Sequence, residues 1–261
     1  MRRVLFAFTG SLLCLMTVAS APAGAATGDV VCEKFGSTPV AGGRYEVQNN
    51  VWGSDQPQCV RAFDTGFEII EGDHHNTSGP AAYPSIFAGC HYGTCTEYTF
   101  LPRAVHDLGT VTSTFAISAP SGGTWVAAYD IWFDPTPRRT DTVTGLELMI
   151  WLRTTGPAPI GEQLGTATVA GSEWEVWRGE NGAQVLTYVR TQPVDRVDGL
   201  DLTAFMRDAT ARGVLPPQWY LTSVQAGFEP WTGGKGLAAT AFAVTGVGAQ
   251  RALHPSPSPV G

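Results

Sequence analysis

Charged residues, cysteines and long apolar runs are all scarce in this sequence. Charged residues make up 15% of the 261 residues, and 23 acidic residues against 16 basic ones give a formal net charge of −7. Nucleic acid is therefore not an expected partner, because a phosphate backbone attracts basic proteins. No segment approaches the roughly 20 consecutive apolar residues that cross a bilayer, so the sequence predicts no association with a membrane.

The sequence also lacks motifs that mark several common chemistries. It contains no Gly-x-Ser-x-Gly elbow, phosphate-binding loop or dinucleotide fingerprint. Zinc sites usually combine two closely spaced cysteine pairs, or cysteine with histidine at matched spacing, and neither pattern occurs. His74 and His75 follow Asp73, and we expect this group to lie in a solvated loop rather than to bind a metal.

The N-terminus has the pattern of a secretory signal peptide. Arg2 and Arg3 precede an apolar stretch over residues 4–18, and small residues at 21–26 offer an Ala-x-Ala cleavage site. The sequence therefore predicts a signal peptide at residues 1–26 and a secreted, extracellular protein. Removal of Arg2 and Arg3 leaves 14 of the 16 basic residues, so the mature chain is more acidic still.

The opposite end of the chain is rich in proline and serine. Residues 253–261 cannot form a core and predict a tail or the start of a linker. Residues 27–252 then form one folded domain, which is long enough for a substantial core. We expect this domain to be a monomer.

Few cysteines are available for disulfides. Cys14 lies in the predicted signal peptide, which leaves four cysteines for an oxidising compartment. Four cysteines allow three pairings. We favour Cys32 with Cys59 and Cys90 with Cys95, because each pair is local and closes a plausible loop or hairpin; a Cys32–Cys90 link would overturn this assignment.

Strand-like runs dominate the predicted domain. The chain has 31 glycines and 18 prolines, and turn residues separate runs that alternate or are continuously apolar. These runs cover residues 45–52, 68–71, 110–117, 124–133, 146–153, 165–169, 173–177, 184–190, 223–231 and 237–247. The pattern predicts an all-β fold in which two antiparallel sheets stack as a jelly-roll-like sandwich.

One segment instead follows helical spacing. Leu202, Phe205, Met206 and Ala209 recur at the period of a helix, and Asp201 can cap its start. Gly213 and the prolines that follow it can end the helix. We therefore expect a single α-helix beside the sheets.

Two segments place a glutamate next to a tryptophan inside an apolar run. In Glu147-Leu148-Met149-Ile150-Trp151, strand alternation puts Glu147, Met149 and Trp151 on one face, while Leu146, Leu148, Ile150 and Leu152 face a second layer. Glu229 and Trp231 repeat this arrangement in Gly227-Phe228-Glu229-Pro230-Trp231. A half-buried lone carboxylate is unfavourable unless it is paired or used, so the two glutamates suggest a sugar-cleaving pair.

Asp130 and the tryptophans extend this hypothesis. Asp130 shares a strand face with Trp132 and could tune the titration of a neighbouring carboxylate. Pyranose rings stack on flat indole rings, and an indole N–H can reach a sugar hydroxyl. Five tryptophans fall in strand-like segments, and each of them fits a core position equally well: Trp52, Trp132, Trp151, Trp177 and Trp231.

Several segments together resemble glycoside hydrolase family 12, the secreted endo-β-1,4-glucanases of clan C. The Glu147 segment resembles the family's nucleophile segment, and the Glu229 segment resembles its acid/base segment, where many members carry Ile or Leu in place of Pro230. The segment that begins at Asp130 resembles the one whose Asp contacts the nucleophile. Further matches are Asn49-Asn50-Val51-Trp52-Gly53, Cys90-His91-Tyr92-Gly93-Thr94-Cys95, Gly156-Pro157-Ala158-Pro159-Ile160-Gly161 and Trp174-Glu175-Val176-Trp177-Arg178-Gly179.

The resemblance implies a curved jelly-roll with a substrate cleft and hydrolysis of internal β-1,4-glucosidic bonds with retention. It implies Glu147 as the nucleophile, Glu229 as the acid/base, Asp130 beside the nucleophile, and no metal or organic cofactor. The Cys90–Cys95 loop lies near the cleft in bacterial members, which supports the local pairing chosen above. The residues that the resemblance assigns to substrate binding are Asn50, Trp52, His91, Trp132, Met149, Trp151, Pro159 and Trp231.

Other interpretations remain open at the level of sequence. A non-catalytic carbohydrate-binding β-sandwich would also be secreted, rich in tryptophan and disulfide-linked, but it would not need both glutamates. A purely structural sandwich explains neither carboxylate. Within the enzyme class, cellulose, mixed-linkage β-glucan and xyloglucan are all possible substrates, because loop shape decides which branches a cleft accepts.

Overall fold

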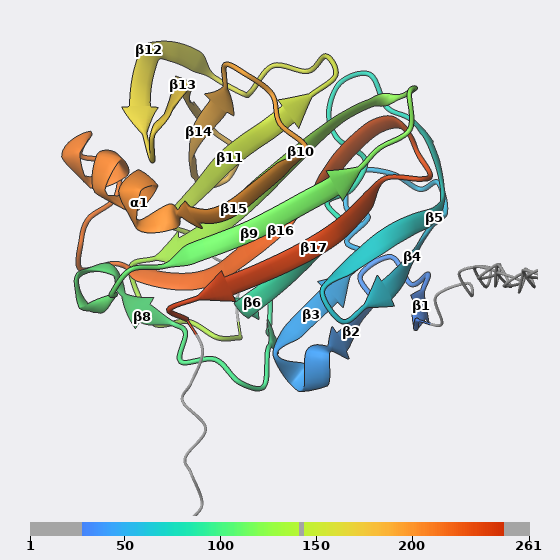
Figure 1. Ribbon diagram of the computed structural model, residues 1–261, viewed down its shortest axis with the longest axis horizontal. Helices are drawn as coiled ribbons and strands as arrows, with labels where there is room; N and C mark the ends of the chain where they lie inside the picture. Colours follow the sequence, from blue (N-terminus) through green and yellow to red (C-terminus); the bar gives the residue numbers. More distant parts are fainter. Residues whose placement is uncertain (1–27, 141–143, 248–261) are drawn as a thin grey trace, which may run out of the picture.

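The computed structural model describes residues 28–140 and 144–247 of the chain. The predicted signal peptide at 1–26 and the tail at 253–261 lie outside the described residues. Strands make up most of the structure, with one α-helix (Figure 1). The elements are β1 (Val30–Val31), β2 (Ser37–Val40), β3 (Tyr45–Gln48), β4 (Gln58–Phe63), β5 (Gly66–His75), β6 (Ser85–His91), β7 (Thr94–Cys95), β8 (Arg103–Ala104), β9 (Thr112–Ser118), β10 (Thr124–Asp134), β11 (Leu146–Thr154), β12 (Glu162–Val169), β13 (Ser172–Glu180), β14 (Gln184–Arg190), β15 (Arg196–Asp201), α1 (Leu202–Ala211), β16 (Tyr220–Gly234) and β17 (Ala238–Thr245), with two short 3₁₀ turns at Ala41–Gly43 and Val105–Asp107.

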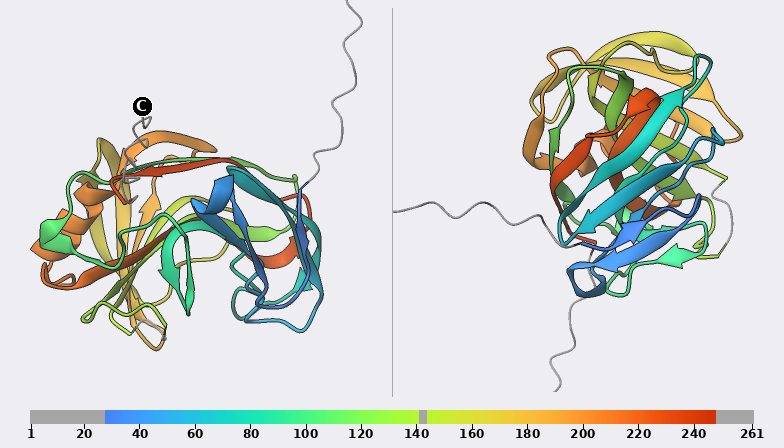
Figure 2. Two further views of the ribbon diagram at one scale, coloured as in Figure 1. Left: turned by 90° about the horizontal axis from the view of Figure 1, so that it is seen from below. Right: turned by 90° about the vertical axis from the view of Figure 1, so that its right-hand side faces the viewer.

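The strands form two stacked sheets, as the sequence predicts. Sheet A has the order β1–β4–β5–β17–β9–β15. Sheet B has the order β2–β3–β6–β16–β10–β11–β14–β13–β12. The two layers and the strong curvature of sheet B are visible when the molecule is turned (Figure 2, left). The pairing of β11 with β14 is parallel, which departs from a purely antiparallel sandwich.

The apolar core lies between the two sheets. On β11, Leu146, Leu148, Ile150 and Leu152 are buried in this core, whereas Met149 and Trp151 belong to a separate cluster on the opposite face of sheet B. The predicted division of this strand into two faces is therefore confirmed. Aromatic rings fill much of the core, and Phe228 of β16 lies against Phe67 and Trp125.

Helix α1 also follows the prediction. The Asp201 carboxylate accepts a hydrogen bond from the backbone N–H of Ala204 at 3.2 Å, which satisfies one of the free N–H groups of the first turn. Beyond the last turn, Gly213 has φ +71, a conformation that favours glycine. Leu202, Phe205, Met206 and Ala209 are all buried in the core. Over residues 28–140 and 144–247, there is no helix with the length and apolar character needed to span a membrane.

Several strand boundaries differ from the sequence-based ranges. The predicted strand over 45–52 ends at Gln48, because Asn50 takes a φ of +44 that an extended strand does not allow. Seven strands lie outside the predicted ranges: β1, β2, β4, β6, β7, β8 and β15. Pro230 lies inside β16, where its missing N–H is accommodated beside a register shift in the pairing with β10.

The prediction for His74 is wrong. His74 is not in a solvated loop: it belongs to β5 and is 0% exposed. Its Nε2 lies 2.9 Å from the Gln58 side-chain oxygen, and its pKa is lowered, mainly by burial. Strand alternation explains the difference, since His75 next to it faces solvent while His74 points inward.

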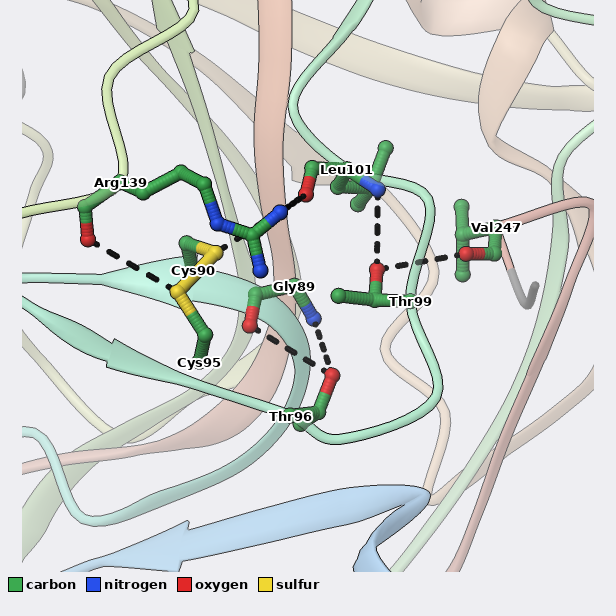
Figure 3. Close-up of a disulfide and its surroundings, with 8 residues drawn as sticks. All are labelled: Gly89, Cys90, Cys95, Thr96, Thr99, Leu101, Arg139 and Val247. Carbon is green, nitrogen blue, oxygen red and sulfur yellow. Dashed lines mark hydrogen bonds between the residues drawn. A yellow bond between two sulfur atoms is a disulfide. The ribbon is translucent and has the colours of Figure 1, made fainter.

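Both predicted disulfides are present. Cys32–Cys59 ties the segment after β1 to β4, and Cys90–Cys95 closes the hairpin formed by β6 and β7. The second disulfide links adjacent strands, and Figure 3 shows it together with the Arg139 guanidinium, which donates to the Leu101 carbonyl oxygen at 2.9 Å.

Candidate active site

A cleft of about 600 Å³ lies on the face of sheet B that does not contact sheet A. Its lining comes from the central strands and from the loops that follow β3 and β11. Ten of the eleven residues assigned above to catalysis or substrate binding line it: Asn50, Trp52, His91, Asp130, Trp132, Glu147, Met149, Trp151, Glu229 and Trp231.

The assignment of Pro159 is not supported. Its neighbours Ala158 and Ile160 line the cleft, but Pro159 does not. Pro159 therefore lies between two residues that line the cleft. Trp177 is also absent from the lining and donates its indole N–H to Glu175 at 3.2 Å.

The two glutamates reach the cleft from strands on either side of β10. Glu147 is on β11, opposite Trp132 of β10, and Glu229 is on β16, opposite Val126 of β10. Asp130 lies on β10 between these two positions. The sheet therefore brings three carboxyl groups from three adjacent strands to one cavity.

Burial and mutual repulsion shift the titration of this group. Burial raises the pKa of Glu147 to about 7. Burial, and then the negative charge of Glu147, raise the pKa of Glu229 to about 8. Glu147 therefore ionises first, and once it carries a charge the proton on Glu229 is harder to remove.

Asp130 is the most deeply buried of the three carboxyls. It is 5% exposed, and its pKa lies well above the ordinary value because of burial and then the charge of Glu147. Oδ2 accepts the indole N–H of Trp132 at 2.8 Å, while Oδ1 has no hydrogen-bond partner among the described residues. A protonated Asp130 places no second charge beside Glu147.

Tyr83 is a cleft residue that the sequence reasoning missed. Its hydroxyl donates to the Ala128 carbonyl oxygen of β10 at 3.0 Å. Burial, together with the charges of Asp130, Glu229 and Glu147, holds its pKa well above the ordinary value. Tyr83 therefore stays protonated and donates its hydrogen bond throughout the range in which the carboxyls titrate.

Aromatic side chains form the walls of the cleft. The Trp132 ring lies 5.9 Å from the His91 ring and 6.5 Å from the Tyr92 ring, centroid to centroid. His91 and Tyr92 belong to the hairpin that the Cys90–Cys95 disulfide closes. The indole N–H groups of Trp151 and Trp231 are buried without a hydrogen-bond partner among the described residues, and they are therefore available to an acceptor in the cleft.

Buried polar side chains continue the cleft floor across β3, β6 and β16. Gln48 lines the cavity and belongs to a hydrogen-bonded group with Ser85 and Gln225. Neither Gln48 nor Gln225 was predicted, although Gln225 has the same strand parity as Glu229 and Trp231. No group of three or more metal-ligating side chains occurs within residues 28–140 and 144–247.

Comparisons with known proteins agree with this arrangement. The family model described as glycosyl hydrolase family 12 matches residues 43–246. A metagenome-derived glycoside hydrolase family 12 endoglucanase of known structure shares 43% identity and a TM-score of 0.82, over 86% of this chain and 99% of that one. Endoglucanase S of Pectobacterium parmentieri is 30% identical over 244 residues, 87% of this chain and 88% of its own. A probable xyloglucan-specific endo-beta-1,4-glucanase A of Aspergillus fumigatus is 31% identical over 236 residues, 85% of this chain and 92% of its own.

Proposed function

The chain belongs to glycosyl hydrolase family 12, and we propose that it cleaves internal β-1,4-glucosidic bonds with retention, using Glu147 as nucleophile and Glu229 as acid/base. The protein is an endo-acting glycoside hydrolase of β-glucans. The proposed mechanism rests on one observation: Glu147, Glu229 and Asp130 line the same cleft, whose walls are aromatic.

The first half of the reaction uses the two glutamates in opposite protonation states. The Glu147 carboxylate forms a bond to the anomeric carbon as the glycosidic C–O bond breaks, and Glu229 gives its proton to the leaving oxygen. In the second half, Glu229 takes a proton from water, whose oxygen attacks the anomeric carbon and releases Glu147. The order of the pKa values, about 7 for Glu147 and about 8 for Glu229, supports these roles.

Asp130 assists through its own proton. Burial and then the charge of Glu147 raise the pKa of Asp130 well above its ordinary value, so ionisation of Glu147 favours the neutral form of Asp130, which would not oppose the charge that the nucleophile needs. The indole N–H of Trp132 holds its carboxyl in place at 2.8 Å. We assign Asp130 to positioning and tuning of Glu147.

The preferred substrate in this proposal is an unbranched β-glucan such as cellulose or mixed-linkage glucan. Solved structures at 43% identity carry the name endoglucanase, whereas a solved family 12 xyloglucanase from Bacillus licheniformis is 26% identical. The aromatic walls at Trp132 and Trp231 suit the flat faces of glucose units. Sugar binding is assigned to Asn50, Trp52, His91, Trp132, Met149, Trp151 and Trp231, with Tyr83 and Gln48 added.

We also propose that the protein is secreted and acts as a monomer. The two disulfides are consistent with an oxidising compartment, and residues 1–26 have the signal-peptide pattern. Mass spectrometry of protein exported by a bacterial host tests the cleavage after residue 26, and light scattering tests the monomer.

The activity is tested by hydrolysis of carboxymethyl-cellulose, barley β-glucan and xyloglucan, with NMR of the fresh products. The expected result is release of the β-anomer from the unbranched polymers, at a rate lost in Glu229→Gln. Glu175→Gln is a matched control, because Glu175 and Trp177 repeat the Glu-x-Trp pattern outside the cleft. Binding without hydrolysis in every variant would instead indicate a carbohydrate-binding module.

A further inference from the structure

Gln225 is a fully buried polar residue at the base of the cleft. It lies on β16, opposite Asp130 of β10 on one side and Phe87 of β6 on the other. Its exposed fraction is 0%. Burial of an unsatisfied amide is unfavourable, so a side chain in this position needs partners.

All four hydrogen-bonding positions of the Gln225 amide are used. Its Oε1 accepts from Gln48 Nε2 at 2.9 Å and from the Ser85 hydroxyl at 3.1 Å. Its Nε2 lies 2.8 Å from His91 Nδ1 and donates to the Ser223 hydroxyl at 3.2 Å. A primary amide has two donors and two acceptor lone pairs, and in this orientation each of them has a partner.

The orientation of Gln225 decides the state of the His91 ring. Its N–H points at Nδ1, so Nδ1 must be the unprotonated nitrogen and the proton of the neutral ring must sit on Nε2. Burial lowers the pKa of His91 to about 3, so the ring stays neutral wherever the catalytic carboxyls titrate. Rings on both sides fix its plane, with centroids 6.1 Å away for Phe87 and 4.5 Å away for Tyr92.

The remaining ring nitrogen is free for a ligand. His91 lines the cleft beside Trp132, and no acceptor for Nε2–H is found among the described residues. Gln48, the other cleft residue that Gln225 holds, is fixed by the same amide and by Ser85. One buried side chain thus determines which polar groups two cleft residues present.

We propose that Gln225 is a positioning residue that locks His91 in the Nε2–H tautomer, so that His91 donates a hydrogen bond to an oxygen of the glucan unit bound beside Trp132. Gln225 itself does not touch the substrate. The proposal rests on the proposed function for the sugar contact, but the tautomer of His91 is a property of the free protein.

The first test is ¹⁵N NMR of histidine-labelled protein without substrate. The His91 signals, assigned by their loss in His91→Gln, are expected to show a protonated Nε2 and an unprotonated Nδ1. A protonated Nδ1 in the wild-type protein would overturn the proposal, whether or not the protein hydrolyses any glucan. This measurement needs no substitution at Gln225.

The second test reverses the polarity of one contact. In Gln225→Glu the ionised carboxylate accepts a hydrogen bond from His91 Nδ1–H, and the ¹⁵N signature, recorded at a pH where this carboxyl is ionised, is expected to show a protonated Nδ1. Ser223→Ala is the matched control, because it removes another partner of the same amide and is expected to leave the His91 signature unchanged. An unchanged His91 signature in Gln225→Glu would overturn the proposal.

Kinetics test the sugar contact. Loss of one neutral hydrogen bond to the bound glucan is expected to raise KM of Gln225→Glu for cellohexaose about 3- to 10-fold. A KM equal to that of Ser223→Ala would overturn the sugar contact. Absence of hydrolysis in the wild-type protein would count against the proposed function and would leave the tautomer result standing.

Discussion

The two faces of sheet B differ in composition: one is apolar and the other carries buried carboxyl groups. On β11, Leu146, Leu148, Ile150 and Leu152 face the core between the sheets and are completely or almost completely buried. The other face of the same strand carries Glu147 between apolar neighbours, close to Asp130. The core face stabilises the fold, while the cleft face holds carboxyls whose burial opposes their ionisation. Substitutions on the two faces should therefore affect different properties.

The largest effect on catalytic activity is expected from Glu147→Gln. The amide cannot form the bond to the anomeric carbon, so kcat is expected to fall by at least about 10³-fold. Initial rates on barley β-glucan measure this loss. Activity within tenfold of the wild type would remove Glu147 from the role of nucleophile.

The same variant is expected to be at least as stable as the wild type at alkaline pH. The folded chain holds the Glu147 proton up to a pKa of about 7, against an ordinary value of 4.5. The folded state therefore binds more protons than the unfolded state, and the contribution of this group to stability declines as pH rises from 4.5 through 7. Thermal unfolding at pH 5 and pH 8.5 should show that stability declines less with rising pH in Glu147→Gln than in the wild type. An equal decline in the two proteins would contradict this prediction.

Substitution of the adjacent core residue should reduce stability more than activity. Leu148 is 0% exposed, and Leu148→Ala is expected to lower the free energy of unfolding by about 2–5 kcal/mol through lost apolar contacts and a residual cavity. Urea unfolding measures this change, and kcat of the folded fraction should fall far less than in Glu147→Gln. A stability loss below 1 kcal/mol would show that the core relaxes around this site.

Electrostatic coupling between Glu147 and Glu229 on the cleft face gives a smaller effect, which is a shift in the pKa of Glu229. The charge of Glu147 is the second cause of the raised pKa of Glu229, after burial. In Glu147→Gln the pKa of Glu229 should therefore fall below about 8 but stay above the ordinary 4.5. NMR titration of ¹³C-labelled glutamate carboxyls measures it. An unchanged pKa would mean that burial alone is responsible.

The pH profile of the wild type depends on the same pair. Hydrolysis needs ionised Glu147 and protonated Glu229, so kcat/KM is expected to rise toward a pH near 7 and to decline above about 8. These apparent values belong to the coupled pair. A profile that is flat from pH 5 to pH 9 would contradict the assignment of an acid and a base.

The difference between the two faces also decides how much could be predicted from sequence. The alternation of Glu147 and Leu148 is a local pattern, so the two faces of β11 were predicted correctly, and the helix at 202–211 follows from Asp201 and its apolar spacing. Strand β6 was missed because all seven of its residues are buried and no alternation appears.

The polar floor of the cleft was missed for a different reason. Gln225 and Gln48 are separated by 177 residues in the chain, and nothing local to either one signals that they meet. Tyr83 likewise bonds a carbonyl 45 residues away. A polar residue on the same strand parity as a suspected catalytic glutamate is a usable signal, and it would have found Gln225 but not Tyr83.

The smallest effect on stability is expected from Tyr83→Phe, in the loop before β6. The phenol hydroxyl donates to the Ala128 carbonyl oxygen, and Ala128 also pairs with strands on both sides. Loss of this hydrogen bond is expected to reduce the free energy of unfolding by about 0.5–1.5 kcal/mol, as measured by urea unfolding. Because the hydroxyl stays protonated beside three carboxyls, its removal should change the pH profile little. A shift of the acid limb by a full pH unit would show instead that Tyr83 takes part in the titration of the cleft, and would extend the functional face of the sheet into the loop before β6.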